Sequence, residues 1–239
     1  MVMRALVEFI LDALFPPQCI PCGEKLPRAA RFLSCCDACL KNIPMRSGFS
    51  CAQCGRRLPL PQNTCHRGTP AVAAATDFTD ASAQALIYAL KYSGLTDAAR
   101  PLAALLHAHL VRHPSLHALA RPVLVPIPLH PKRLRTRGFN QSELVARELS
   151  RLLSDTLPTD AASLVRTANT TTQTAEATRE KRRKNVRGAF AVADASRIRG
   201  ATVLLVDDVC TSGGTLTEAA RALRAAGAAH IIGLVIARA

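Results

Sequence analysis

The sequence predicts an α/β protein, in which helices flank a parallel sheet, preceded by a small metal-binding module. An unbroken aliphatic run at residues 203–206 is typical of a strand buried on both faces of such a sheet. Near the other end of the chain, eight of the nine cysteines lie within residues 19–65, and three pairs have the Cys-x-x-Cys spacing of zinc ligands. We therefore expect an N-terminal helix and zinc module over residues 1–70 and an α/β domain over residues 71–239.

The first part of the chain, up to Pro16 and Pro17, is apolar at helical spacing. Glu8 and Asp12 interrupt the apolar run and no small-residue cleavage site follows it, so an amphipathic helix is favoured over a signal peptide. The run is also too short to span a membrane. We therefore expect a cytoplasmic protein whose thiols stay reduced and free to bind metal.

The cysteines form two clusters. The first is a complete set of four thiolates: Cys19, Cys22, Cys36 and Cys39. A tetrahedral zinc site closed by four protein ligands has a structural role. The second supplies three thiolates: Cys51, Cys54 and Cys65. Gly68 stands where a fourth cysteine is expected, which leaves three alternatives: His66 as fourth ligand, Cys35 as fourth ligand, or a second half without metal.

The middle of the chain is predicted to alternate helices and strands. Residues 69–75 predict a connector, residues 81–92 and 97–112 predict helices, and residues 121–128 predict a strand that ends at prolines. Asn140 or Ser142 would cap a further helix that runs to about residue 153. Residues 164–167 predict a short strand, and residues 230–237 the last one.

The aliphatic run at residues 203–206 leads into a predicted phosphate site. Asp207 and Asp208 follow where the strand should end, and carboxylates at the carboxyl end of a core strand lie where α/β folds bind ligands. A loop of hydroxyls and glycines comes next: Cys210, Thr211, Ser212, Gly213, Gly214 and Thr215. It opens a predicted helix over residues 216–226, and backbone N–H groups at a helix start attract anions.

The net charge of +14 indicates polyanionic partners, and two segments concentrate it. The first is a predicted loop before the residue-140 helix, with Lys132, Arg133, Arg135 and Arg137. The second is a polar stretch over residues 168–188, with Lys181, Arg182, Arg183, Lys184 and Arg187. Both sets suit either pyrophosphate oxygens or a DNA backbone. Aromatic residues make up only 4% of the chain, which argues against an extensive base-stacking platform.

The stretch over residues 203–215 resembles the phosphoribosyl-pyrophosphate (PRPP) signature of the type I phosphoribosyltransferases. The resemblance implies that Asp207 and Asp208 are catalytic residues that hold the ribose hydroxyls, and that residues 210–215 hold the 5′-phosphate. It also implies Mg²⁺ bound with PRPP, and a mobile loop over residues 168–188 that closes on the pyrophosphate.

Further motifs narrow this resemblance. They are Leu-Lys-Tyr-x-Gly at residues 90–94, Pro-Ile-Pro-Leu at 126–129, Arg-Gly-Phe-Asn-Gln-Ser at 137–142 and Asn-Val-Arg-Gly-Ala-Phe at 185–190. Together with the cysteine pairs they resemble the ComF family of competence proteins, also called GntX-like, in which a double zinc ribbon precedes a type I phosphoribosyltransferase domain. The departures are Gly68 in place of a cysteine and an apparent one-residue insertion between Gln173 and Asn185.

The ComF resemblance implies a protein that binds PRPP with Mg²⁺ and serves the uptake or handling of single-stranded DNA in natural transformation, with a competence helicase as a further partner. Two alternatives stay open. One is an active phosphoribosyltransferase, although the sequence identifies neither an acceptor pocket nor a general base. The other is a non-catalytic nucleic-acid-binding module.

Overall fold

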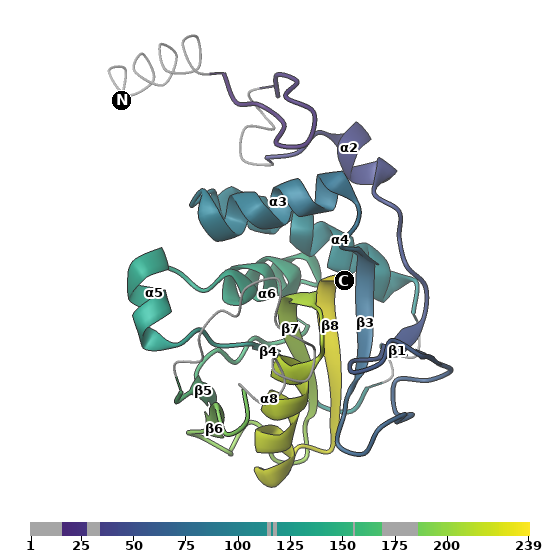
Figure 1. Cartoon of the computed structure of the whole chain (residues 1–239), viewed down its shortest axis with the longest axis vertical. Coiled ribbons are helices and arrows are strands. Elements are labelled where there is room, and N and C mark those ends of the chain that lie inside the picture. Colours follow the sequence, from purple (N-terminus) through teal and green to yellow (C-terminus); the bar gives the residue numbers. More distant parts are fainter. Residues whose placement is uncertain (1–15, 28–33, 114–115, 117–118, 155, 169–185) are drawn as a thin grey trace.

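The computed structural model describes residues 16–27, 34–113, 116, 119–154, 156–168 and 186–239 (Figure 1). The predicted N-terminal helix lies outside these residues. So do four cations of the second basic segment: Lys181, Arg182, Arg183 and Lys184. None of the helices in the described ranges is long and apolar enough to cross a membrane.

A six-stranded sheet forms the centre of the molecule, with strand order β2-β1-β3-β8-β7-β4. Four of its strands are parallel to one another: β3 (Ala71–Asp77), β4 (Pro122–Pro126), β7 (Thr202–Cys210) and β8 (His230–Arg238). Two short antiparallel strands extend one edge: β1 (Phe49–Cys51) and β2 (Arg57–Leu58). A separate antiparallel pair is formed by β5 (Leu164–Arg166) and β6 (Phe190–Val192). The predicted α/β class is confirmed.

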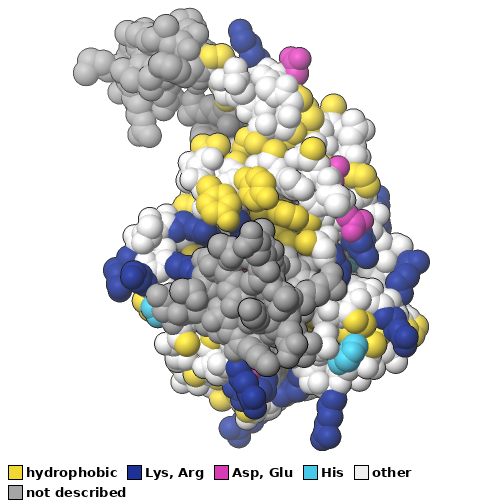
Figure 2. Space-filling model, viewed as in Figure 1, with side chains coloured by type: hydrophobic (Ala, Val, Ile, Leu, Met, Phe, Trp, Pro, Cys, Tyr) yellow, Lys and Arg dark blue, Asp and Glu magenta, His cyan; other side chains and the backbone are white. Residues whose placement is uncertain are grey.

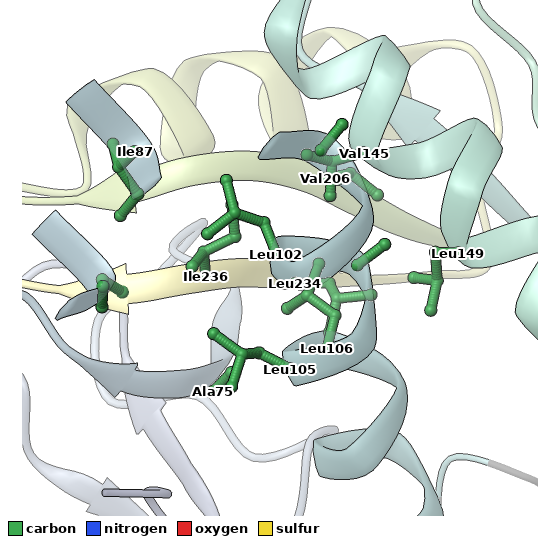
Figure 3. Packing of buried hydrophobic residues seen from close by; sticks show 14 of the residues in the cluster. Ala75, Ile87, Leu102, Leu105, Leu106, Val145, Leu149, Val206, Leu234 and Ile236 are labelled. Atoms are coloured by element: carbon green, nitrogen blue, oxygen red, sulfur yellow. The ribbon is translucent and has the colours of Figure 1, made fainter. Parts of the chain in front are cut away.

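Helices cover both faces of the sheet, as expected for buried parallel strands. One face carries α3 (Ala81–Tyr92), α4 (Ala99–Val111) after a short 3₁₀ turn (η2, Thr96–Ala98), and α6 (Gln141–Leu152). The other carries α8 (Gly214–Ala225) and the β5–β6 pair. Side chains alternate between the two cores along β7. Leu204 and Val206 belong to the core under α4 and α6, and Figure 3 shows Val206 there. Val203 and Leu205 belong to the core under α8.

Three local predictions are wrong. Residues 69–75 are not a connector, because residues 71–77 form the buried strand β3, whose small alanines let helix α4 pack closely on the sheet. The strand at residues 203–206 does not end before the acidic pair, because β8 continues the ladder as far as Cys210. The first cationic segment is not a loop but helix α5 (Pro131–Arg137), which starts with a proline and ends at Gly138 with φ +83°.

The cysteine module is built onto the α/β part through this sheet. Its helix α2 (Asp37–Asn42) begins at Cys36, whose thiol accepts a hydrogen bond from the Cys39 N–H. Strand β1 pairs with β3, at Ser50 with Val72 and at Cys51 with Ala71, so the ladder crosses the predicted boundary at residue 70. Figure 1 shows the two halves of the module apart: α2 lies beyond α3, and β1 lies beside β3.

Candidate functional site

The first cysteine cluster has the donor set of a structural zinc site. The Sγ atoms of Cys19, Cys22, Cys36 and Cys39 all lie within 4.8 Å of one another. Backbone N–H groups point at the sulfurs, with Cys36 N donating to Cys19 Sγ at 3.3 Å. Although burial raises it, N–H donors from Cys36 and Cys22 lower the pKa of the Cys19 thiol to about 7. Four convergent sulfurs with N–H donors fit Zn²⁺.

The second cluster is completed by a histidine. Ligand atoms of Cys51, Cys54, Cys65 and His66 lie within 4.8 Å of one another, with 3.5 Å from Cys51 Sγ to His66 Nδ1. Cys35 is elsewhere: its thiol is buried and donates to the Cys36 carbonyl at 3.4 Å. Burial raises the pKa of Cys35 to about 12, which keeps it protonated. Of the two candidates for the fourth ligand, the structure brings His66 to the cluster.

A pocket of about 270 Å³ opens where β4 ends beside β7, at the carboxyl edge of the sheet. This is the position at which open α/β sheets bind their ligands. Its lining comes from α3, the β4–α5 connection, α5, α6, β5, β7 and α8: Lys91, Tyr92, Ile127, Leu129, Arg133, Arg137, Gln141, Arg166, Asp207, Asp208 and Thr215. The predicted acidic pair, two of the predicted cations and the loop residue Thr215 therefore meet in one cavity.

Asp208 is the more deeply fixed of the two acids. One carboxylate oxygen pairs with Lys91 Nζ at 2.7 Å, and the other accepts from Gln141 Nε2 at 3.0 Å. The Asp208 side chain is only 8% exposed. Burial alone would lower the pKa of Lys91, but the Asp208 carboxylate raises it above its ordinary value. The Asp208 side chain is thus held in place from two helices, α3 and α6.

Asp207 also lines the pocket and is the more solvent-accessible of the two acids. Its Oδ1 accepts from Ser142 Oγ at 3.2 Å and from the Asp208 N–H at 2.9 Å. Asp207 keeps partial solvent access through the pocket, but protein packs closely around it on the other sides. This burial and the charge of Asp208 raise the pKa of Asp207 to about 7, against the opposing effect of Lys91. Near neutral pH the acid can take up or release a proton when a ligand binds.

The predicted cations divide into two groups. Arg133 and Arg137 line the pocket, whereas Lys132 and Arg135 are exposed on helix α5 outside it. Arg137 Nη1 donates to Gln141 Oε1 at 2.6 Å and so orients the amide that holds Asp208. Of the second segment, Arg187 is described and is exposed.

The loop over residues 211–215 turns tightly into helix α8. Thr211 is exposed, Ser212 and both glycines are buried, and Thr215 reaches the pocket. Gly213 caps α8 with φ +71°. The Cys210 side chain does not join this set, although it was predicted to: its buried thiol donates to the Ala52 carbonyl at 3.6 Å and accepts from Arg238 at 3.5 Å.

The second cysteine cluster packs against the back of this loop. The Ala52 carbonyl, between the ligands Cys51 and Cys54, also accepts from Arg238 Nη2 at 3.2 Å. A Cβ placed on Gly213 would overlap that same Ala52 carbonyl. The backbone of the module and the backbone of the loop are therefore in direct contact, with no room for a side chain between them.

Comparison with known proteins accounts for both parts of the chain. Residues 10–69 match the double zinc ribbon domain, and residues 137–239 match the phosphoribosyl transferase domain. DNA utilization protein YhgH of Salmonella typhi is 30% identical over an alignment of 216 residues that covers 87% of this chain and 91% of that protein. Competence protein F of Haemophilus influenzae is 35% identical over 134 residues, 55% of this chain and 57% of that protein. The chain belongs to the ComF family.

The fold expected from the ComF resemblance is therefore confirmed: a zinc-ribbon module followed by a phosphoribosyltransferase domain. The pocket is also lined by polar residues that were not predicted as site residues, among them Lys91, Gln141 and Arg166. Lys91 and Gln141 stand inside the family motifs at residues 90–94 and 137–142, and this position could have identified them as site residues. Arg166 stands in no quoted motif, and only the position of β5 brings it to the pocket.

The second zinc set of this ComF protein can be tested by counting metal. Replacing His66→Ala removes a ligand whose ring nitrogen lies 3.5 Å from Cys51 Sγ. We expect bound zinc, measured by mass spectrometry, to fall from about two to about one ion per chain, because three thiolates leave an open position. The Cys35→Ser variant is the matched control and should keep both ions. Loss of zinc from Cys35→Ser alone would contradict the assignment.

The acidic pair predicts opposite effects of two similar substitutions on stability. The pKa of Asp207 in the folded protein, about 7, lies above the ordinary aspartate value of 3.8 that applies to the unfolded chain. Asp207 therefore lowers the free energy of unfolding progressively as pH rises from 3.8 to about 7, and the full cost persists at higher pH. Asp207→Asn should therefore raise the melting temperature at pH near 8 and have little effect near pH 4. Its amide oxygen can still accept from Ser142 and from the Asp208 N–H.

Asp208→Asn should instead lower the melting temperature, since it leaves the largely buried Lys91 without its carboxylate. A cost of about 1–3 kcal/mol is typical of a buried group that loses its partner. Thermal unfolding followed by circular dichroism at several pH values measures both variants. Shifts of the same sign at pH near 8 would show that the two acids do not have the separate environments described.

The contact between the loop over residues 211–215 and the zinc-ribbon module predicts that an alanine in place of Gly213 strongly lowers the free energy of unfolding. Gly213→Ala combines a positive φ with overlap on the Ala52 carbonyl, whereas Gly188→Ala has a similar φ of +73° and nothing within 4 Å of the added Cβ. We expect Gly188→Ala to cost about 1 kcal/mol of unfolding free energy. Gly213→Ala should cost about 1–3 kcal/mol more, because backbone must move. Equal costs in urea unfolding would refute the contact.

Proposed function

We propose that this ComF-family protein binds PRPP with Mg²⁺ in the pocket at the carboxyl edge of the sheet and uses this in handling single-stranded DNA. The observation that carries the proposal is the pairing, in one cavity, of two fixed carboxylates with Arg133, Arg137 and the start of helix α8. Carboxylates suit ribose hydroxyls and a hard cation, whereas arginines and helix N–H groups suit phosphates. PRPP carries all of these groups.

In this proposal each part of the site has its own task. Asp207 and Asp208 hold the ribose and stabilise positive charge at its reacting carbon. The loop ending at Thr215 takes the 5′-phosphate, and the arginines of α5 take the pyrophosphate. Mg²⁺, when bound, neutralises the pyrophosphate oxygens. Lys91 and Gln141 act through Asp208, which they orient.

The DNA part of the proposal has separate support. The relatives are named for DNA utilization and for competence, and the chain carries a net charge of +14. Positive charge of this size favours nucleic acid through release of counterions. We place this role in the cytoplasm, where the ribbon thiols stay reduced. Transfer of the phosphoribosyl group to an acceptor is the second candidate function, and release of pyrophosphate in the presence of DNA would support it.

Calorimetric titration of the zinc-loaded chain with PRPP and Mg²⁺ tests the proposal. Arg137→Gln removes a pocket cation and should weaken PRPP binding about tenfold, the loss of one charge-assisted hydrogen bond. Arg135→Gln, on the exposed side of the same helix, should stay within about twofold of the wild type. Affinity should increase as pH rises through about 7, because Asp207 must lose its proton. No heat with wild-type protein would rule the proposal out.

A further inference from the structure

Helix α3 carries an exposed aromatic face beside the pocket. The chain has two tyrosines and no tryptophan, and both tyrosines, Tyr88 and Tyr92, lie on this helix. They are four residues apart, so they share one helix face. Tyr88 is 44% exposed and Tyr92 is 74% exposed, and Leu95 just beyond the helix is 48% exposed. Figure 2 shows hydrophobic side chains gathered over this part of the molecule, with Lys and Arg side chains at their border.

The rings form an ordered row. Phe78 and Tyr88 are 6.0 Å apart in an edge contact at 85°, and Tyr88 and Tyr92 are 5.9 Å apart at 48°. Phe78 packs against the core and anchors the row. Tyr92 is at the other end, where its ring lines the pocket and lies 5.9 Å from the guanidinium carbon of Arg137. The row therefore leads from the core of the protein to the mouth of the pocket.

Packing within the chain accounts for Phe78 and partly for Tyr88, but not for Tyr92. A side chain that is 74% exposed contributes little through burial. An exposed ring beside guanidinium groups is instead the arrangement that proteins use to bind single-stranded nucleic acid, in which bases stack on rings and cations contact phosphates. The exposed cations of α5, Lys132 and Arg135, lie outside the pocket and are available for such phosphates.

We propose that the Tyr88–Tyr92 face of α3 is a base-stacking surface for single-stranded DNA, with the backbone directed over α5 and one end of the strand at the mouth of the pocket. Because the rings are 5.9 Å apart and tilted, no base fits between them, since insertion needs roughly 6.8 Å, twice the 3.4 Å base rise. Bases stack on the outward sides of the rings. This deepens the DNA part of the proposed function but does not depend on PRPP binding.

Tyrosine emission reports directly on this surface, because the chain has no other tyrosine and no tryptophan. The zinc-loaded chain is titrated with oligo(dT) at low salt without PRPP or Mg²⁺, and the tyrosine fluorescence lifetime, which DNA absorption does not distort, is recorded. We expect oligo(dT) to shorten the lifetime. An abasic oligodeoxynucleotide of equal length carries the same phosphates without bases and should leave it unchanged. Equal effects of both oligonucleotides, or no effect of either, would overturn the proposal.

Variants of the two tyrosines then test whether the rings contribute to the affinity for DNA. By anisotropy of labelled oligo(dT), Tyr92→Ala should weaken binding about tenfold or more, the loss of a stacking contact, whereas Tyr92→Phe should stay within about twofold. Val111→Ala, an exposed apolar position on α4, is the matched control and should have no effect. If Tyr92→Ala and the Tyr88→Ala/Tyr92→Ala double variant bind like the wild type, the surface serves another partner and the proposal is wrong.

A last comparison distinguishes failure here from failure of the PRPP site. Tyr88 does not line the pocket. Tyr88→Ala should therefore weaken oligo(dT) binding and leave the PRPP titration unchanged. Weakened PRPP binding with unchanged oligo(dT) binding would overturn the assignment of this face to DNA while leaving the pocket proposal in place.

Discussion

The contact of the Ala52 carbonyl with the back of the loop over residues 211–215 joins the two parts of the molecule. This one oxygen accepts from Cys210 and Arg238 and leaves no room for a Cβ on Gly213. Ala52 is itself held between two cysteines of the second zinc set and beside the β1–β3 ladder. Because zinc binding supplies the folding free energy of such small modules, metal at this set would also fix the loop geometry. The zinc-ribbon module therefore helps to hold the loop over residues 211–215 in place.

The acidic pair, Asp207 and Asp208, is also held by residues from other elements. Two adjacent carboxylates at a strand end repel each other, and their separate environments resolve this conflict. Asp208 pairs with the Lys91 ammonium and accepts a hydrogen bond from Gln141, whereas Asp207 lines the pocket with a raised pKa. The arrangement costs stability, as functional sites often do, and leaves Asp207 ready for a positively charged or proton-donating ligand.

The aromatic face of α3 shows what an argument from composition leaves out. Few aromatic residues argued against an extensive stacking platform, and this still holds for the chain as a whole. However, both tyrosines fall on one helix face, and Tyr92 lies beside Arg137 of the pocket. The positions of the two tyrosines, rather than their number, make their rings one exposed surface. Helical spacing at residues 88 and 92 contained that information, but which face of α3 is exposed depended on how the helix packs.

The sequence by itself determined the elements with strong local signals. These are the parallel strand at residues 203–206, the helix at residues 81–92, the first zinc set and the acidic pair with its Gly loop. Aliphatic runs, ligand spacing and capping residues each involve only a few neighbouring positions, so they can be recognised in a short stretch of sequence. Tertiary structure decided what depends on distant partners: alanine-rich β3, His66 as fourth ligand, and Lys91 and Arg166 in the pocket. Each depends on partners from other segments of the chain, and spacing along the sequence does not settle which partners those are.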